Sequence, residues 1–294
     1  MKPFSYLTPG TAEQAVGLLG QHGPQAQVIA GGQSLLLAMK TRTARPAVLV
    51  SLAGVAGLSG VRRTESGQLV VGATTTYAAL TRAPLTGWHT EIAAIAGNLA
   101  DRPVRTMGTI GGALCAADPR YDMLPLVAGT GAELEVLGPS GVRTLLAAEF
   151  FAPGGGTTLA PDEILAAIRF PAADAFTAVA FEKFRQRTFD AALASVLCAV
   201  RTDSGGRIDT ARITVGAVRP APVLASAGAA ALAGAAAGDL DLDAVGTRVA
   251  TEALGADGGT PLVQYQRELV RALTARALRT ALRPLDLRPL DSRS

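Results

Sequence analysis

The chain has 294 residues, of which 49% are apolar and 17% charged, and its formal net charge is +3. This composition excludes a disordered chain and is sufficient for a sizeable core. The two cysteines and two histidines, Cys115, Cys198, His22 and His89, lie far apart in the sequence. They exclude a disulfide scaffold, an iron–sulfur cluster and a zinc site, so we expect no metal in this chain.

The N-terminal residues 1–14 contain no continuous apolar segment of the kind found in export signals. The longest uncharged stretch, residues 220–238, is mostly Ala and Gly and has only three large aliphatic residues, too few for a membrane span. These features predict a cytoplasmic protein with reduced cysteines and no membrane span.

Positive charge is concentrated at the C-terminal end. Residues 265–294 contain seven arginines and three acidic residues, a net charge of +4, which leaves −1 for the rest of the chain. No aromatic residues interleave with these arginines, as stacking on single-stranded nucleic acid would require. The pattern favours a solvated helix face or a partner surface, and we expect no nucleic-acid partner.

In the first half, helical and extended patterns alternate around two glycine-rich segments. Capping residues, apolar periodicity and turn signals predict helices at 12–19, 35–40, 77–80, 91–99 and 123–128, and strands at 27–30, 48–52, 69–74, 133–137, 142–145 and 164–170. Gly31-Gly32 follows the first strand, and Gly111-Gly112 follows the fourth helix. We therefore expect two glycine loops at junctions where backbone N–H groups are free.

The second half has a different pattern, and we expect a domain boundary close to Pro171. Strands are predicted at 178–184, 193–201 and 213–218, followed by helices at 223–237, 242–254 and 263–282 and by a proline-containing tail. Consecutive strands followed by consecutive helices are typical of an antiparallel sheet backed by helices. We therefore expect this region to form an α+β unit.

The two glycine loops are the main chemical signal. Successive amides in a turn without Cβ atoms form a nest that binds a phosphate, and two nests suit the diphosphate of a dinucleotide. Ser34 and Thr109 add hydroxyl groups at the ends of the loops. Glycine pairs are also common in ordinary tight turns, and neither loop matches a P-loop or a Rossmann fingerprint. The residues by themselves indicate only candidate phosphate nests.

Several ordered motifs resemble the flavoprotein (medium) subunit of the molybdenum hydroxylases, the family of the aerobic carbon monoxide dehydrogenases, to which the FAD domain of xanthine dehydrogenases is similar. The motifs are Val28-Ile29-Ala30-Gly31-Gly32-Gln33-Ser34, Val104-Arg105-Thr106-Met107-Gly108-Thr109-Ile110-Gly111-Gly112 and Asp118-Pro119-Arg120-Tyr121-Asp122. Shorter matches in family order cover nearly the whole chain.

The resemblance implies an α+β chain with a two-part FAD-binding domain of the PCMH/vanillyl-alcohol-oxidase type and a C-terminal antiparallel sheet with helices. The expected domains are residues 1–173, divided into about 1–55 and 56–173, then 174–283, and a flexible tail at 284–294. The implied FAD-binding residues are Val28, Ile29, Ala30, Gly31, Gly32, Gln33, Ser34, Leu35, Thr109, Ile110, Gly111, Gly112, Ala113, Asp122, Leu165 and Lys183.

Within this set the resemblance gives each group a role. The two loops would wrap the diphosphate, Asp122 would lie near the ribityl or adenosine part, Leu165 would pack on FAD, and Lys183 would lie close to the isoalloxazine. Ala113 departs from the family, which usually has Asn or Ser there, so one side-chain hydrogen bond to the cofactor is lost or replaced by backbone. The family's C-terminal Tyr-Arg-Arg pattern is Tyr265-Gln266-Arg267 here, which leaves that position without an assigned role.

The resemblance also implies partners. A large molybdopterin-binding subunit oxidises the substrate, a small subunit with two [2Fe-2S] clusters passes electrons to FAD, and the complex is expected to be a dimer of heterotrimers. The flavin performs the redox step, so no catalytic side chain is expected here. Two alternatives remain: a stand-alone PCMH-type FAD oxidase, and a non-catalytic nucleotide-binding adaptor.

Four further side chains carry expectations of their own. Cys115 is expected to be a small buried filler and His22 and His89 to be surface residues. Phe189 falls where the chain should pass the flavin ring, and it is equally compatible with shielding the ring or packing in the core.

Overall fold

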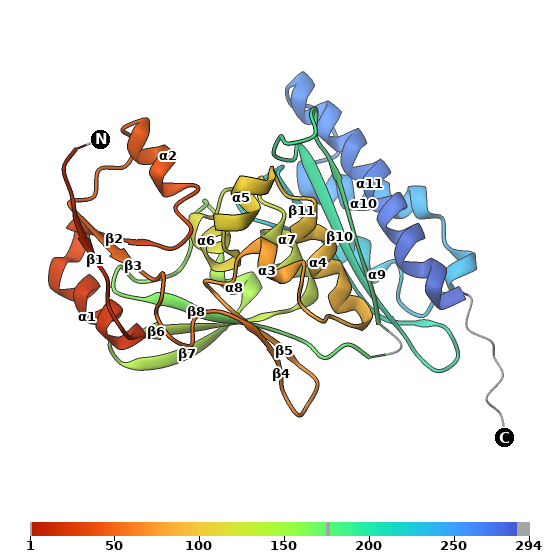
Figure 1. The fold of residues 1–294 in the computed structure, drawn as a ribbon. Helices are drawn as coiled ribbons and strands as arrows, with labels where there is room; N and C mark the ends of the chain where they lie inside the picture. Colours follow the sequence, from red (N-terminus) through yellow and green to blue (C-terminus); the bar gives the residue numbers. More distant parts are fainter. Residues whose placement is uncertain (1, 175–176, 287–294) are drawn as a thin grey trace. The chain divides into compact units, whose positions relative to one another are not determined.

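The computed structural model describes residues 2–174 and 177–286 of the chain (Figure 1). These residues form two compact units. The first contains residues up to 84 together with 96–118 and 131–172, and the second contains 85–95, 119–130 and the residues from 173 onward.

The first unit contains two sheets. Its strands are β1 (Ser5–Leu7), β2 (Ala26–Ile29), β3 (Val48–Ser51), β4 (Val61–Arg63), β5 (Leu69–Gly72), β6 (Glu133–Gly138), β7 (Gly141–Leu146) and β8 (Ile164–Phe170). The first three form a small parallel sheet in the order β1-β3-β2, and the others form an antiparallel sheet in the order β4-β5-β8-β6-β7. Two sheets from separate stretches of sequence agree with the expected two-part architecture.

Short helices connect these strands. They are α1 (Ala12–His22), α2 (Leu35–Lys40), α3 (Tyr77–Leu80), α5 (Arg102–Met107), α6 (Ile110–Ala116) and α8 (Ala147–Phe150), with α4 (Thr90–Gly97) between α3 and α5. Thr11 caps α1 by accepting from the amide of Gln14, as its sequence predicts. The apolar face of α1, Ala15, Val16 and Leu19, packs with Val48 and Val50 of the parallel sheet.

The second unit is built on one antiparallel sheet. Its strands are β9 (Thr177–Phe184), β10 (Ala194–Thr202), β11 (Ile208–Gly216) and β12 (Val223–Leu224), in the order β12-β11-β10-β9. Its helices are α7 (Met123–Thr130), α9 (Ser226–Ala230), α10 (Leu242–Leu254) and α11 (Pro261–Asp286). This is the antiparallel sheet with helices that the C-terminal sequence predicts.

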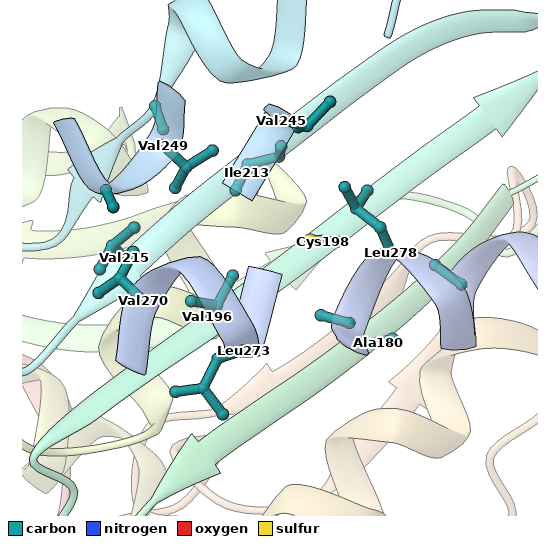
Figure 2. Close-up of a cluster of buried hydrophobic side chains, with 14 of the residues drawn as sticks. Ala180, Val196, Cys198, Ile213, Val215, Val245, Val249, Val270, Leu273 and Leu278 are labelled. Atoms are coloured by element: carbon teal, nitrogen blue, oxygen red, sulfur yellow. The ribbon is translucent and has the colours of Figure 1, made fainter. Parts of the chain in front are cut away.

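Alternation along β10 assigns its two faces to different helices. Val196 and Cys198 join the apolar cluster shared with α10 and α11 (Figure 2), because successive strand residues point to opposite faces. On the other face, a Cβ placed on Gly129 of α7 would lie 2.5 Å from Leu197 Cδ2, so α7 packs closely there. The sheet is therefore covered by helices on both faces, and most residues of its inner strand β10 are buried.

Some predicted elements differ from the structure. The helix expected at 223–237 is wrong: Val223 and Leu224 pair with β11, only Ser226–Ala230 is helical, and Gly234 adopts a positive φ of 74°. Helix α11 continues to Asp286, past the predicted end at Leu282. The rest of the predicted flexible tail, residues 287–294, lies outside the described residues.

Four short elements, β1, β4, α5 and α8, were not predicted from the sequence. Each has six residues or fewer, which is too short for a periodic pattern to emerge.

Candidate functional site

The first glycine loop joins the end of β2 to the start of α2, within the first unit. Gly32 adopts a positive φ of 71°, a conformation open to glycine without steric cost. Within the described part of the chain, the N–H groups of Gly31, Gly32 and Gln33 make no hydrogen bond. Three successive unbonded amides beside a left-handed glycine form a concave set of donors for an anion.

The two glycine segments lie side by side. A Cβ on Gly31 would stand 1.9 Å from the carbonyl oxygen of Met107 and 3.0 Å from Cα of Gly108. The first loop therefore packs directly on the end of α5, just ahead of the second segment. This contact brings together residues 28–35 and 109–113, which the sequence analysis paired as one site.

The second segment does not form the free loop that its glycines suggest. Gly111 and Gly112 belong to the first turn of α6, which Thr109 caps by accepting from the Gly112 amide at 3.1 Å. The amides of Ile110 and Gly111 donate to the carbonyls of Thr75 and Ala73, at 3.0 and 2.8 Å. The expectation of free amides is wrong here, because the helix start presses on residues 73–75. The segment offers an approachable backbone surface rather than unbonded donors.

The remaining predicted residues of this unit differ in accessibility. Val28, Ala30 and Leu35 are half-buried. Ile29, Ile110, Ala113 and Leu165 are buried in the core, with 8% or less of each residue exposed. Ile29 packs with Met39 and Leu49. Contacts between these buried residues and a cofactor stay predictions.

Asp122 and Lys183 form a buried ion pair in the second unit. Asp122 immediately precedes α7, Lys183 lies on β9, and their side chains are 3% and 8% exposed. Burial raises the pKa of the Asp122 carboxyl, while the charge and hydrogen bond of Lys183 act in the opposite direction. The two residues, 61 positions apart in the sequence, are thus a single structural feature, which the sequence analysis treated as two separate ones.

Comparison with known proteins decides the family. Residues 2–173 match the family model "FAD binding domain in molybdopterin dehydrogenase", and residues 179–281 match "CO dehydrogenase flavoprotein C-terminal domain". The chain belongs to the FAD-binding medium subunits of the molybdenum hydroxylases. It is therefore a subunit of an oxidoreductase, and FAD is the cofactor of its first domain.

Relatives and solved structures agree with this assignment. The carbon monoxide dehydrogenase medium chain of Afipia carboxidovorans is 35% identical, over 95% of this chain and 96% of its own length. A structure of carbon monoxide dehydrogenase from Hydrogenophaga pseudoflava matches with a TM-score of 0.88 and 33% identity, over 96% of this chain and 98% of that one. Quinoline 2-oxidoreductase from Pseudomonas putida 86 matches with a TM-score of 0.84 and 28% identity, over 97% and 99%. The fold class inferred from the sequence is thereby confirmed.

Two side chains of this medium subunit lie elsewhere than the sequence analysis expected. His89 is fully buried: it belongs to a short 3-10 turn in which its ring makes an edge contact with the ring of Trp88, with the ring centroids 4.4 Å apart. Cys115 is exposed, since Ile110 and Leu114 occupy the inward face of α6. Surrounding protein nevertheless raises the pKa of the Cys115 thiol to about 12, so this thiol is not a reactive thiolate.

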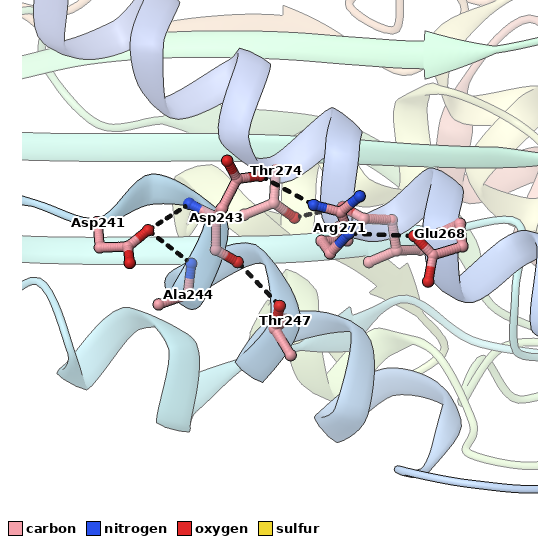
Figure 3. A network of polar contacts seen from close by, with 8 residues as sticks. Asp241, Asp243, Ala244, Thr247, Glu268, Arg271 and Thr274 are labelled. Atoms are coloured by element: carbon pink, nitrogen blue, oxygen red, sulfur yellow. Dashed lines mark hydrogen bonds and ion pairs between the residues drawn. The ribbon is translucent and has the colours of Figure 1, made fainter.

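Three arginines of α11 have partners within the medium subunit. Arg271 bonds to Asp243 and Glu268 and so connects α11 with the start of α10 (Figure 3). Arg276 pairs with Glu182, and Arg267 donates to the carbonyl oxygens of Gly255 and Gly258. These contacts favour the helix-face interpretation of the basic segment.

The described residues include neither a candidate metal site nor a membrane-spanning helix. No group of three or more His, Cys, Asp or Glu side chains there could hold a metal ion. None of the described helices combines the length and the apolarity that crossing a membrane needs.

The backbone groups that complete the site could not be identified from the sequence. Backbone contacts hold both glycine segments. The first segment packs on Met107 and Gly108, and the second donates hydrogen bonds to Ala73 and Thr75. Backbone atoms carry no residue-type signal, so only the family motif around Gly108 could have pointed to them.

Proposed function

We propose that this medium subunit transfers electrons from the [2Fe-2S] clusters of a small partner subunit, through FAD, to an external acceptor such as NAD, oxygen or a quinone-linked carrier. Substrate oxidation then belongs to a large subunit with the molybdopterin cofactor. The observation that carries the proposal is the first glycine loop, whose unbonded amides fit an anion in a chain of this flavoprotein family.

The diphosphate of FAD would be held by the loop from Ala30 to Ser34. Its amides are oriented before binding, so little conformational entropy is lost when they bond to phosphate oxygens. Thr109 to Ala113 would supply the adjacent wall, in which Gly112 is half-buried and Gly111 packs on Ala73. Ala113 has no polar side chain, so no side-chain hydrogen bond is assigned to it.

Lys183 would lie near the isoalloxazine, and Asp122 would act as its positioning residue. When bound, FAD supplies an electron carrier whose reduced ring is negatively charged near N1 and C2=O. A lysine ammonium stabilises that charge only if it is held in place, and Asp122 fixes Lys183 through their buried ion pair. Removing Asp122 would leave a buried ammonium without its carboxylate.

Three finer expectations stay predictions within this proposal. They are the dimer of heterotrimers, the location in the cytoplasm, and the identity of the partner subunits. The medium chains and subunits among the relatives belong to carbon monoxide, caffeine and nicotine enzymes, among others, so the substrate class is left open.

The test is to purify the full chain, record its visible spectrum, and release and identify the chromophore. We expect one FAD per chain and no reduction of the flavin by candidate substrates until the iron–sulfur and molybdenum partners are added. A folded chain that neither holds nor takes up FAD would contradict the proposal. Flavin reduction by substrate alone would indicate the stand-alone oxidase instead.

A second measurement tests the role of Asp122. Lys183→Met should lower the flavin reduction potential, because it removes the cation that stabilises the reduced ring, and Asp122→Asn should change the potential and the flavin spectrum, because Lys183 loses the carboxylate that fixes it. An unchanged potential in both variants, with FAD still bound, would assign the ion pair to stability alone.

A further inference from the structure

A basic hollow lies at the C-terminal end of α2. Lys2, Arg42 and Arg45 line it together with Met39, Ala44 and Pro46, and its volume is about 260 Å³. The lining contains three cationic side chains and no carboxylate. Among the described residues, no acidic group pairs with any of the three. Clustering like charges without a counter-ion is unfavourable, and this arrangement favours an anion supplied from outside the chain.

The backbone of Arg42 is held in a conformation that suits glycine. Its φ is 65°, and it directly follows Thr41, the C-cap of α2. Helices commonly place Gly or Asn at this position, because a Cβ there is strained. An arginine at this point therefore lowers stability relative to glycine. Strained residues of this kind cluster at ligand-binding sites, where the side chain has a use.

Arg42 and Arg45 are not needed to cap the C-terminal end of α2. The amide of Thr41 bonds to Leu37, and the amide and hydroxyl of Thr43 bond to Ala38, all through the carbonyl oxygens of the last helical turn. The guanidinium of Arg45 contributes one bond from Nε to the carbonyl of Arg42, at 3.2 Å. The Arg42 guanidinium makes no hydrogen bond to another described residue, so its donors are available to a ligand.

We propose that this hollow binds a phosphate group of a small molecule. A guanidinium presents paired donors that match phosphate oxygens. Three cations are also better balanced by a phosphate dianion than by a ligand with a single carboxylate. The buried side chain of Met39 and the buried Pro46 border the hollow and limit hydration of the contacts. The volume is below that of pockets for whole drug-sized ligands, which suits one or two phosphate groups.

The proposed site is distinct from the glycine loop. The loop precedes α2 and the hollow follows it, and six helical residues separate the two ends by about 9 Å. The hollow and the glycine loop therefore lie at opposite ends of α2.

The test is calorimetric titration of the full FAD-saturated chain with pyrophosphate, at constant ionic strength. Saturating FAD keeps the probe out of the glycine loop. We expect saturable binding, weakened at least about tenfold in Arg42→Gln/Arg45→Gln, because each loses charge-assisted hydrogen bonds. Arg62→Gln/Arg82→Gln removes the same charge from exposed positions of the same unit and should bind like the parent.

Arg42→Gly separates binding from folding. It should raise the Tm of the chain without pyrophosphate, because the strain at φ 65° is relieved, and it should lose most of the Tm increase that pyrophosphate gives the parent. The proposal is overturned if the parent shows no saturable binding, if the Arg42→Gln/Arg45→Gln variant binds as tightly as the parent, or if citrate binds as tightly as pyrophosphate.

Discussion

At the residue scale, the glycines of the site have roles in packing as well as in binding. Gly31 touches the backbone of Met107, and Gly111 stands where a Cβ would lie 2.5 Å from that of Ala73. A bulky residue such as valine at 111 would therefore disturb α6 itself. Gly32 is different, since its Cβ would meet side chains rather than backbone, Leu36 at 3.0 Å and Ile29 at 3.5 Å.

Gly31→Ala should abolish FAD binding and destabilise the first unit by roughly 1–3 kcal/mol, because its Cβ overlaps a carbonyl oxygen that cannot move freely. Fluorescence titration with FAD and urea unfolding measure the two effects. The control is Gly17→Ala in α1, where a Cβ meets nothing within 4 Å. Equal behaviour of the two variants would disprove the close packing of the loop on α5.

Glu91 provides a pH test. Burial is the main cause that raises the pKa of the Glu91 carboxyl, and the nearby Glu182 raises it further. The hydrogen bond that Glu91 accepts from the Phe181 amide, at 3.1 Å, acts in the opposite direction. Since the folded pKa is above the unfolded one, the stability that Glu91 contributes is complete below the unfolded pKa, about 4.3, and is lost as the pH rises through the folded value.

Glu91→Gln should therefore be about as stable as the parent at pH 4 and more stable at pH 7.5, because the amide keeps an acceptor for Phe181 without the charge. Urea unfolding at the two pH values measures this difference. Glu65→Gln, on the exposed turn between β4 and β5, serves as the charge-matched control. A Glu91→Gln variant less stable than the parent at pH 7.5 would contradict the prediction.

At the element scale, a sequence with few aromatic residues packs its helices closely. Only 4% of residues are aromatic. Helices α10 and α11 lie so close together that a Cβ on Gly246 would be 2.5 Å from the carbonyl oxygen of Arg271. Asp243 and Arg271 then join the same two helices through an ion pair at 3.0 Å (Figure 3).

Gly246→Ala should force α10 away from α11 and cost about 1–2 kcal/mol, even though alanine favours the helix by roughly 1 kcal/mol. Chemical denaturation measures the loss. Gly238→Ala, at a position with no atom within 4 Å of the new Cβ, should change stability by only a few tenths of a kcal/mol. Similar losses in both variants would show that helix contact is not the cause.

At the scale of the whole molecule, each compact unit has apolar clusters of its own, and the glycine segments belong entirely to the first. A cofactor that binds only the folded chain stabilises it by mass action, by about 2.7 kcal/mol when its concentration is one hundred times Kd.

Removal of flavin should therefore lower the Tm of the chain by several degrees, and added FAD should restore it in a concentration-dependent manner. Differential scanning calorimetry with and without FAD measures this shift, with Gly31→Ala as the variant that should not respond. A Tm independent of FAD in the parent would indicate that the chain does not bind it when folded.

Much of the fold could be predicted because its signals are local. Thr11 and Thr76 precede helix starts and cap them, and the Gly138–Gly141 turn marks the hairpin of β6 and β7. The segment 223–237 was mispredicted because Ala and Gly fit a helix, a turn or a short strand equally well. Which one forms depends on pairing with β11, a contact that the residue types of this segment do not specify.

The sequence by itself determined the fold class, the family and the presence of two glycine segments, since these depend on residue types in a fixed order. The tertiary structure decided that only the first segment keeps unbonded amides, that Asp122 and Lys183 form one buried pair, and that Arg42 lies strained beside a basic hollow. Each of these depends on which backbone or side chain comes within a few ångströms from elsewhere in the chain, and the order of residue types does not specify such distances.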